Sequence, residues 1–338
     1  MENLLKNQTP TITLEKALKL KNTLFLDARS QKEFQQAHIP DSINLPILNN
    51  EDRALVGTIY KQVSKTQAID KAMQLFQPKI NNYLKKIPKN KTIIVYCWRG
   101  GLRSKVITNL LNQNNIKAFQ LELGHKNYMN YVWKQLEKPY KPKFITLFGN
   151  TGTRKTEIIT RINLPKIDLE GLAQHRSSLF GSINLIPRTQ KMFSTLLYNE
   201  LNKLKNEKYV IIEGESKKIG TIFLPEIINK KINSDLKIRV QASIKTRINT
   251  IKKEYFKDES SIKKISEITD KLTKFFGKKK IYELKTQINN KEYNKFIEFI
   301  LLEYYDKRYI HNKQPHKYNL TINSDNLDKA IKEIEGFI

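Results

Sequence analysis

Two short apolar strands, each followed by a glycine-containing loop and a helical pattern, constrain the fold of this chain more than any other feature. TIIVYC (92–97) leads through WRGGLR into SKVITNLLNQNN (104–115), and FITLF (144–148) leads through GNTGTRKT into EIITRI. Uninterrupted β-branched runs of this kind are typical of strands buried on both faces of a parallel sheet. The repeated strand–loop–helix order therefore predicts an α/β protein.

The remaining pattern divides the 338 residues into two predicted domains. KPYKPK (138–143) contains two prolines and lacks apolar periodicity, which indicates a linker between a first domain, 1–137, and a second domain, 144–338. The second domain contains the predicted strands YVIIE and KIRVQA, and beyond residue 244 its periodicity is helical and very basic. The other elements predicted in the first domain are helices at 13–20 and within 53–87, and strands at 23–27, 42–45 and 117–123.

The charge balance indicates a polyanionic partner. The chain has 61 Lys and Arg residues against 33 Asp and Glu residues, a formal net charge of +28. A strongly basic protein of this kind carries the electrostatic footprint of phosphate-backbone binding. The alternative is a lysine-rich and asparagine-rich compositional bias, which explains many lysines but not the shortage of acidic residues. We therefore expect a nucleic-acid partner.

Several classes of site and location are disfavoured. No stretch reaches the roughly 18 apolar residues that a membrane span needs, and residues 1–8 lack the apolar core of a secretory signal, so we expect a cytoplasmic protein. A single cysteine rules out an intrachain disulfide framework and a thiolate-rich zinc site. The five histidines are not spaced as zinc ligands, so no metal-ligand set is predicted. The sequence indicates no oligomeric state.

The only cysteine, Cys97, is predicted to lie at the carboxyl end of a buried strand, just before a helix. Backbone N–H groups of the intervening loop would point inward as an anion cradle, with two glycines permitting the tight turn. The helix dipole and nearby guanidinium groups would favour the thiolate, which is the nucleophilic form. The pattern indicates a covalent catalyst rather than a buried apolar cysteine. The catalytic candidates are Cys97, Arg99 and Arg103, and the anion-binding candidates are Trp98, Gly100, Gly101 and Leu102.

The residues around this loop resemble a known family. DARSQKEFQQAHIPDSINLP (27–46) followed by YCWRGGLRS (96–104) resembles a rhodanese-like domain, in which a loop cysteine carries sulfur as a persulfide. CWRGGLRS together with EDRALVGTIYKQ (51–62) is similar to tRNA 2-selenouridine synthase in particular. The second half adds three similar stretches, LEGLAQHRSSLFG (169–181), IIEGESKKIG (211–220) and LLEYYDKRY (301–309). The resemblance implies a rhodanese-like parallel-sheet domain followed by a P-loop NTPase-like α/β domain with a basic helical C-terminal region.

The spacing of the cysteine loop adds a separate point. Arg103 follows Cys97 by six positions, which is the Cys-x5-Arg interval of phosphatase loops, whereas common sulfurtransferase loops are one residue shorter. A longer ring of N–H donors should hold a tetrahedral anion better than a bare sulfur atom. This fits selenophosphate, the selenium donor that the resemblance implies. A phosphatase stays an alternative, although Tyr96 stands where those enzymes usually have histidine.

Four polar residues in the other rhodanese signatures, Asp27, Arg29, Glu33 and His38, are expected to be mostly structural. His38, which precedes Ile39 and Pro40, fits a hydrogen-bonded turn residue better than a base.

GNTGTRKT (149–156) nearly satisfies the P-loop pattern of Gly, four residues, Gly, Lys and Ser or Thr. The diphosphate-binding candidates are Gly149, Gly152, Lys155 and Thr156, of which Lys155 would reach phosphate oxygens and Thr156 would offer its hydroxyl to a magnesium ion. Arg154 replaces the second glycine of the pattern, where a side chain would narrow the loop or change its dihedral angles. A helix-capping turn without phosphate binding is the alternative.

The resemblance implies that the second domain holds tRNA and geranyl diphosphate, an isoprenyl donor that alkylates the sulfur of 2-thiouridine. The candidates for tRNA or phosphate contacts are His175, Arg176, Glu213 and Arg308. Glu213 would hold magnesium or a water, or would cap the neighbouring helix. Ser177 stands where the family pattern has glycine, and the sequence does not identify the isoprenyl pocket.

The implied reaction replaces sulfur with selenium at C2 of the wobble uridine of tRNA. A geranyl group is first transferred to the thiocarbonyl sulfur, selenium from selenophosphate then reaches C2 through a selenium analogue of a persulfide on Cys97, and geranyl thiol departs. The implied partners are tRNA and an enzyme that supplies selenophosphate. The alternatives are a rhodanese-type sulfurtransferase with a non-tRNA acceptor, a P-loop kinase or ATPase with an accessory rhodanese domain, and a non-enzymatic RNA-binding protein.

Overall fold

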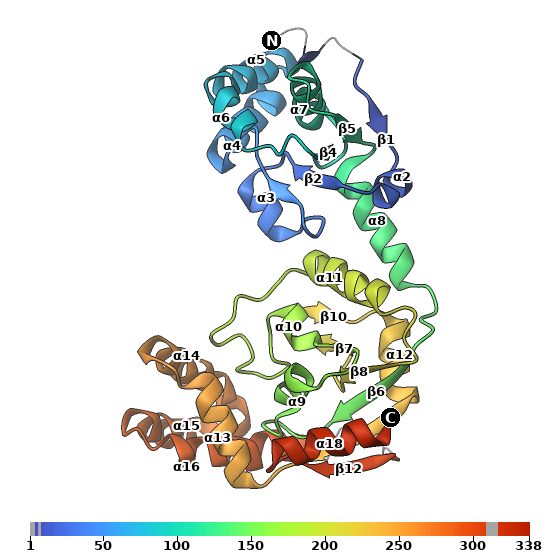
Figure 1. Ribbon diagram of the computed structural model, residues 1–338. Coiled ribbons are helices and arrows are strands. Elements are labelled where there is room, and N and C mark those ends of the chain that lie inside the picture. The colour runs from blue at the N-terminus through green and yellow to red at the C-terminus, as the bar shows by residue number, and fades with distance from the viewer. Residues whose placement is uncertain (1–3, 6–7, 309–316) are drawn as a thin grey trace. The chain divides into compact units, whose positions relative to one another are not determined.

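The computed structural model describes residues 4–5, 8–308 and 317–338, so Tyr309 of the stretch LLEYYDKRY lies outside the described residues. The chain divides into two compact units, one up to Leu136 with Ser194–Leu196, and one of Glu137–Phe193 with Leu197–Ile338. Each unit contains a parallel sheet with helices (Figure 1), so the predicted α/β fold is confirmed. Within the described residues, no helix is long and apolar enough to cross a membrane.

The first unit is built on a sheet of five parallel strands in the order β1-β5-β4-β2-β3. The strands are β1 (Thr11–Ile12), β2 (Thr23–Asp27), β3 (Ile43–Asn44), β4 (Thr92–Tyr96) and β5 (Ala118–Leu121). The sequence predicted β4 from its apolar, β-branched run. Its four residues after Thr92 are all buried, as expected for a central strand. This central position places the end of β4 between the ends of β2 and β5.

Helices cover this sheet, and Figure 1 shows α4 to α7 together on one side of it. Apolar residues of α5, α6 and α7 pack with Leu26, Ile93 and Val95 of the strands in one core cluster. The sequence analysis did not predict the helix α8. The helices are α2 (Leu14–Lys19), α3 (Gln31–Gln36), α4 (Asn50–Gln62), α5 (Lys65–Phe76), η1 (Gln77–Lys79), α6 (Ile80–Lys85), α7 (Leu102–Gln113) and α8 (Gly124–Leu136).

The second unit has a sheet of five parallel strands in the order β12-β11-β6-β8-β7. The strands are β6 (Lys143–Phe148), β7 (Lys166–Ile167), β8 (Tyr209–Glu213), β11 (Leu236–Gln241) and β12 (Leu320–Asn323), and the first helix after β6 is α9 (Lys155–Arg161). Beyond residue 244 the chain is mainly helical, as the sequence predicted, but it also contains β12, which the sequence analysis did not predict. This short strand pairs with β11 at the edge of the sheet. A run of four residues is too short for its periodicity to predict a strand.

Four helices and a π-helical segment form a separate layer of the second unit with its own apolar cluster. Figure 1 shows α13 to α16 grouped beside the sheet. They are α13 (Ile244–Tyr255), α14 (Glu259–Thr269), η2 (Asp270–Leu272), α15 (Thr273–Asn289), α16 (Tyr293–Phe299) and the π-helical η3 (Ile300–Asp306). The remaining elements are α10 (Leu169–Ala173), α11 (Gln190–Lys203), β9 (Lys218–Ile219), β10 (Ile222–Phe223), α12 (Glu226–Ser234) and α18 (Leu327–Phe337).

Candidate functional site

Cys97 directly follows β4 and lies at the base of the loop that leads into α7. It is 4% exposed, and the Gly101 N–H donates a hydrogen bond to Cys97 Sγ at 3.1 Å. Ser104 Oγ, in the first turn of α7, lies 3.2 Å from the same sulfur. A backbone N–H donor and a side chain in the first turn of α7 thus both contact the sulfur. The arrangement can therefore hold a nucleophilic sulfur at the edge of the sheet.

Ser104 and Gln120 hold the loop in this shape, and the sequence analysis assigned a role to neither. Gln120 Nε2 donates to the carbonyl oxygens of Gly100 (2.8 Å) and Gly101 (3.1 Å) and to Ser104 Oγ (2.9 Å). Ser104 Oγ donates to the Gly101 carbonyl at 3.1 Å. Gln120 lies in β5, opposite Val95 of β4, so only strand pairing brings it to the loop. The Gln120 amide thus binds the carbonyl oxygens of the loop, and the Gly101 N–H is directed toward the sulfur.

Gly124, at the start of α8, supports the loop from the other side by close backbone contact. The His125 N–H donates to the Cys97 carbonyl at 2.8 Å, and the Lys126 N–H donates to the Trp98 carbonyl at 2.9 Å. Gly124 has φ of +55°, and an added Cβ would lie 2.3 Å from the Cys97 carbonyl oxygen. Only glycine fits this crossing, because both the conformation and the space exclude a side chain.

Arg103 is held by a carboxylate of α3. Its Nη1 and Nη2 donate to Glu33 at 2.7 and 3.3 Å. Glu33 also accepts from the Ser30 N–H in a capping box. Burial alone would raise the pKa of Glu33, but the hydrogen bond and charge of Arg103 outweigh it and leave that pKa below its ordinary value. In this structure Arg103 is therefore an anchored cation beside the loop, whereas Arg99 is exposed to solvent.

A groove of about 980 Å³ adjoins the cysteine loop within the first unit. Apolar side chains of α4 and α5 form much of its wall, and cations such as Arg53, Lys61 and Lys65 line it as well. The loop residues that line it are Cys97, Trp98, Arg99, Gly101, Leu102 and Arg103. Gly100 is turned the other way, since an added Cβ would lie 2.9 Å from the Leu121 carbonyl oxygen. The sulfur thus lies at a cavity large enough for a nucleotide-sized group.

The other three rhodanese-signature residues, Asp27, Arg29 and His38, have structural contacts. Arg29 forms a buried ion pair with Asp27 at 2.6 Å and donates to the Ala37 carbonyl. His38 stacks on Phe34 with ring centroids 3.9 Å apart, and its Nδ1 lies 2.9 Å from the Phe34 carbonyl. These contacts agree with the structural role expected from the sequence.

The second candidate site is the loop between β6 and α9. An added Cβ on Gly149 would lie 2.5 Å from the Val240 carbonyl oxygen of β11, and Gly152 has φ of +83°. Lys155 Nζ curls over the loop and donates to the Gly149 carbonyl at 2.9 Å. The strand, loop and helix have the order that P-loops use to bind phosphate at a helix N-terminus. The geometry can receive a diphosphate.

Arg154 adopts the left-handed conformation, with φ of 62° and ψ of 23°, which the usual glycine supplies at this position. Its guanidinium donates to Glu157 at 2.9 and 3.1 Å and to the Ser324 carbonyl at 3.0 Å. These contacts hold the side chain against α9 and the segment after β12. Arg154 therefore keeps the backbone conformation that glycine normally supplies in this loop. This conformation is strained in an L-residue and costs roughly 1–2 kcal/mol.

Buried carboxylates gather around Thr156. Its Oγ1 lies 2.9 Å from Glu213 Oε1 and 3.1 Å from Glu170 Oε2. Burial, and then the charges of Glu170 and Asp168, raise the pKa of Glu213 well above its ordinary value. Burial and Glu170 also raise the pKa of Glu215, to about 7. Carboxyl groups with raised pKa values are typical of functional sites. A cation bound beside them would favour their ionised form.

The magnesium ion expected beside Thr156 was tested against these donors. Among the described residues, no group of three or more His, Cys, Asp and Glu side chains is arranged as a metal site. Magnesium usually takes one or two carboxylates together with substrate phosphates and waters. Thr156 and Glu213 fit that smaller set, because their oxygen atoms lie close together and the carboxyl group of Glu213 is buried, which raises its pKa. Glu213 also accepts from the Glu170 N–H at 3.1 Å, so it caps α10 as the alternative prediction had it.

Arg247 and Asp306 fasten the P-loop to the helical layer, and the sequence analysis identified neither. The two form a bidentate ion pair at 2.8 and 2.7 Å. Arg247 Nε donates to the Thr151 carbonyl at 2.9 Å, and Asn150 Nδ2 donates to Asp306 Oδ1 at 3.0 Å. No local pattern signals this pair, because its partners come from α13 and η3.

The predicted tRNA or phosphate contacts are only partly brought together. Arg176 and Arg308 line a cavity of about 550 Å³ above the P-loop, together with Lys155, Thr156 and Glu215. Arg176 is paired with Glu254 at 3.3 Å, and Arg308 donates to Tyr304 at 2.9 Å. His175 instead packs beside Gly220, where an added Cβ would lie 2.8 Å from its ring. Burial lowers the pKa of His175, which favours the neutral ring.

Family models match both parts of the chain. The family model described as the tRNA 2-selenouridine synthase AAA domain matches residues 142–335, and the rhodanese-like domain model matches residues 12–133. The crystal structure of the N-terminal domain of a putative ATP/GTP binding protein from Clostridium difficile is 39% identical over 36% of this chain and 98% of that one, with a TM-score of 0.35.

Two relatives described as tRNA 2-selenouridine synthase show how far the similarity extends. The one from Nitrosomonas europaea is 32% identical over 250 residues, which is 71% of this chain and 65% of that protein, so this alignment spans slightly less than two thirds of the relative. The one from Sulfurovum is 28% identical over 96% of both chains. With a family model matched over more than half of its length and both loops in place, the chain belongs to the tRNA 2-selenouridine synthase family.

Proposed function

We propose that the protein converts 2-thiouridine at the wobble position of tRNA into 2-selenouridine, through S-geranyl-2-thiouridine, using geranyl diphosphate and selenophosphate. The observation that carries the proposal is the hydrogen bond from the Gly101 N–H to Cys97 Sγ, at the edge of a large groove on a chain that also has a P-loop. The net charge of +28 supports tRNA as the substrate. Membership of the family supports the reaction as a whole.

The first step is assigned to the second unit. The sulfur of 2-thiouridine attacks C1 of the geranyl group, the C1–O bond breaks, diphosphate leaves, and the N3 proton of the uridine is lost. Lys155 and the P-loop N–H groups stabilise the negative charge that develops on the leaving diphosphate. A magnesium ion held by Thr156 and Glu213 would supply further charge neutralisation for that leaving group.

The second step is assigned to Cys97. Cys97 Sγ attacks the phosphorus of selenophosphate and the P–Se bond breaks, which releases selenide. Selenide adds to C2, the C2–S bond breaks and the geranyl thiol leaves, while water hydrolyses the phosphocysteine to phosphate and free Cys97. A perselenide on Cys97 would need a two-electron oxidant that neither co-substrate supplies. The overall exchange is redox-neutral, because selenium enters at the selenide level and sulfur leaves as a thiol. Gly101 and the N-terminus of α7 stabilise the negative charge on Cys97, while Arg103, anchored by Glu33, keeps a cation beside the groove. tRNA and an enzyme that supplies selenophosphate are the partners.

Two variants with opposite defects test the assignment. Cys97→Ala should still form S-geranyl-2-thiouridine but no selenouridine, whereas Lys155→Ala should lose geranylation yet selenate tRNA that is supplied already geranylated. The nucleosides are identified by mass spectrometry after each co-substrate is omitted in turn. Lys332→Ala, an exposed lysine on α18, is the charge-matched control. Normal selenouridine formation by the Cys97 variant would refute the role given to the thiol.

The same assay separates the alternatives. Thiosulfate turnover without tRNA would favour a stand-alone sulfurtransferase, and nucleotide hydrolysis that depends on Lys155 would favour a P-loop ATPase. Salt-sensitive tRNA binding with no modified nucleoside would favour a non-enzymatic RNA-binding protein.

A further inference from the structure

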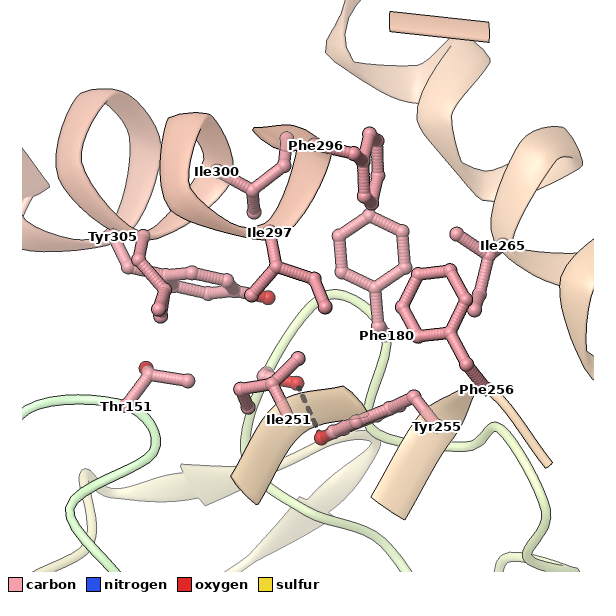
Figure 2. Close-up of a pocket in the computed structure, with 12 residues that line it drawn as sticks. Thr151, Phe180, Ile251, Tyr255, Phe256, Ile265, Phe296, Ile297, Ile300 and Tyr305 are labelled. Carbon is pink, nitrogen blue, oxygen red and sulfur yellow. Dashed lines mark hydrogen bonds between the residues drawn. The ribbon is translucent and has the colours of Figure 1, made fainter. Parts of the chain in front are cut away.

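Two aromatic residues of α15 are exposed, although the other rings of the helical layer pack inside it. Figure 2 shows Phe180, Phe256 and Phe296 in that interior, around an apolar cavity of about 30 Å³ that is too small for an organic ligand. By contrast, Phe275 is 48% exposed and Tyr282 is 76% exposed. A ring normally stabilises a fold by being buried, so two exposed rings on one helix single out this surface.

The same part of α15 is strongly basic. The stretch KLTKFFGKKK (271–280) contains five lysines and no acidic residue. Lys274, Lys278 and Lys279 are exposed, and within the described residues none of them forms an ion pair, whereas Lys280 pairs with Glu283 at 2.9 Å. Lysines without a carboxylate partner keep their charge available for an anion.

Phe275 connects this basic stretch to the cavity above the P-loop. The guanidinium carbon of Arg308 lies 5.1 Å from the ring centroid of Phe275 and 5.0 Å from that of Tyr304. The rings of Phe275 and Tyr304 meet edge to face, with centroids 5.5 Å apart. Arg308 and Tyr304 both line the cavity, which has a volume of about 550 Å³. The exposed ring of Phe275 therefore lies beside the rim of that cavity.

We propose that an α15 patch, which consists of Lys274, Phe275, Lys278, Lys279 and Tyr282, binds the anticodon loop of tRNA. An unpaired loop base stacks on Phe275, and the lysines contact phosphates. The inference rests on the proposed function and adds the surface that holds the RNA. Unpaired RNA bases stack on aromatic rings and guanidinium planes, which the paired bases of a stem do not. A neighbour of the wobble uridine then stacks at the rim while the uridine itself enters the cavity.

The composition of the patch favours RNA over an acidic protein. Protein interfaces are depleted in lysine and have a fully buried, apolar core. Here the rings are interleaved with lysines, and Lys274 Nζ lies 5.1 Å from the ring centroid of Phe275. Alternating rings and cations are complementary to a chain that alternates bases and phosphates.

Variants of the full-length protein test the patch by RNA binding alone, without either co-substrate. The probes are a fluorescent anticodon stem-loop and a blunt duplex of the same stem, and affinity is measured by anisotropy. Phe275→Leu should weaken stem-loop binding about ten-fold and leave duplex binding unchanged, because a duplex offers no unpaired base. Phe275→Tyr keeps a ring and should bind the stem-loop as the parent protein does.

The double variant Lys278→Gln with Lys279→Gln tests the phosphate contacts. Its plot of log affinity against log salt concentration should be less steep by about 1.5, since two fewer phosphates are neutralised. The matched controls are Lys329→Gln with Lys332→Gln on α18, and Phe223→Leu, at another exposed phenylalanine that has a lysine neighbour. Both controls should bind like the parent, and thermal unfolding checks that every variant is folded.

Because binding is measured apart from modification, this proposal and the proposed function can fail separately. If tRNA is never modified but its binding depends on Phe275, the reaction is wrong and the patch stands. If selenouridine forms while the patch variants bind the stem-loop as the parent does, the reaction stands and the patch is wrong. Equal losses for stem-loop and duplex in Phe275→Leu, or equal losses in the controls, would also overturn the patch.

Discussion

Arg247 and Asp306 are 59 positions apart in the chain, yet they form a bidentate ion pair at 2.7 and 2.8 Å directly behind the P-loop. The same two side chains hold Thr151 and Asn150 of the loop through hydrogen bonds. The loop conformation therefore depends on the helical layer, although the loop itself is encoded by eight contiguous residues. This dependence leads to the first prediction.

Asp306→Ala should destabilise the second unit and weaken diphosphate binding. The substitution leaves Arg247 buried without its carboxylate, and breaking a buried pair of this kind costs about 3 kcal/mol or more. Chemical denaturation and calorimetry with inorganic diphosphate measure both effects. Asp328→Ala removes the exposed partner of Arg161 and should change stability by less than about 1 kcal/mol. Similar losses in the two variants would show that the position of Asp306 has no special importance.

Arg154→Gly should preserve diphosphate binding, because glycine adopts the left-handed conformation of residue 154 without strain. The relief of roughly 1 kcal/mol offsets the lost contacts with Glu157 and Ser324, so the change in unfolding free energy should be small. Arg154→Val should destabilise the loop instead, since a β-branched residue is strongly disfavoured there. Thermal unfolding with and without diphosphate compares the variants, and equal behaviour of Gly and Val would contradict the strain argument.

Gly124→Ala should abolish selenium transfer while leaving geranylation intact. The added methyl group would lie 2.3 Å from the Cys97 carbonyl and would push the cysteine loop away from α8. Gly336→Ala, on α18, is the control for an added methyl group, because its added Cβ meets no described atom within 4 Å and it lies in neither site. Both products are quantified from the same tRNA digest. Full selenation by the Gly124 variant would mean that the contact at α8 does not position the loop.

The stability of the ligand-free protein should fall as pH rises from about 5 to 8, relative to Glu215→Gln. Burial and Glu170 raise the pKa of Glu215 to about 7 in the folded state, above the value of 4.5 for the free group. Its stabilising contribution is therefore present below about pH 4.5 and is lost as pH rises through 7. The unfolding free energy of the parent minus that of the variant should fall by about 2–3 kcal/mol over this range. A pH-independent difference would exclude Glu215 as the titrating group.

The sequence predicted the two loops more completely than their surroundings. Cys97 after a buried strand and Lys155 at a helix start are set by contiguous residues, and the structure has both where the pattern indicated. The pattern missed Gln120, which reaches the cysteine loop only because β5 pairs with β4. It also assigned no function to Glu170, although this residue lies within a stretch that resembles the family.

Sequence alone determined the alternation of strands and helices, the excess of positive charge and the chemical type of each loop, because periodicity and spacing are properties of neighbouring residues. The tertiary structure decided which side chains complete the loops. Glu33 meets Arg103, Asp306 meets Arg247, and Phe256 meets Phe296 across distances in the chain that no local pattern spans. Parallel strands and packed helices join residues that are remote in sequence, so contacts of this kind become visible only when the chain is folded.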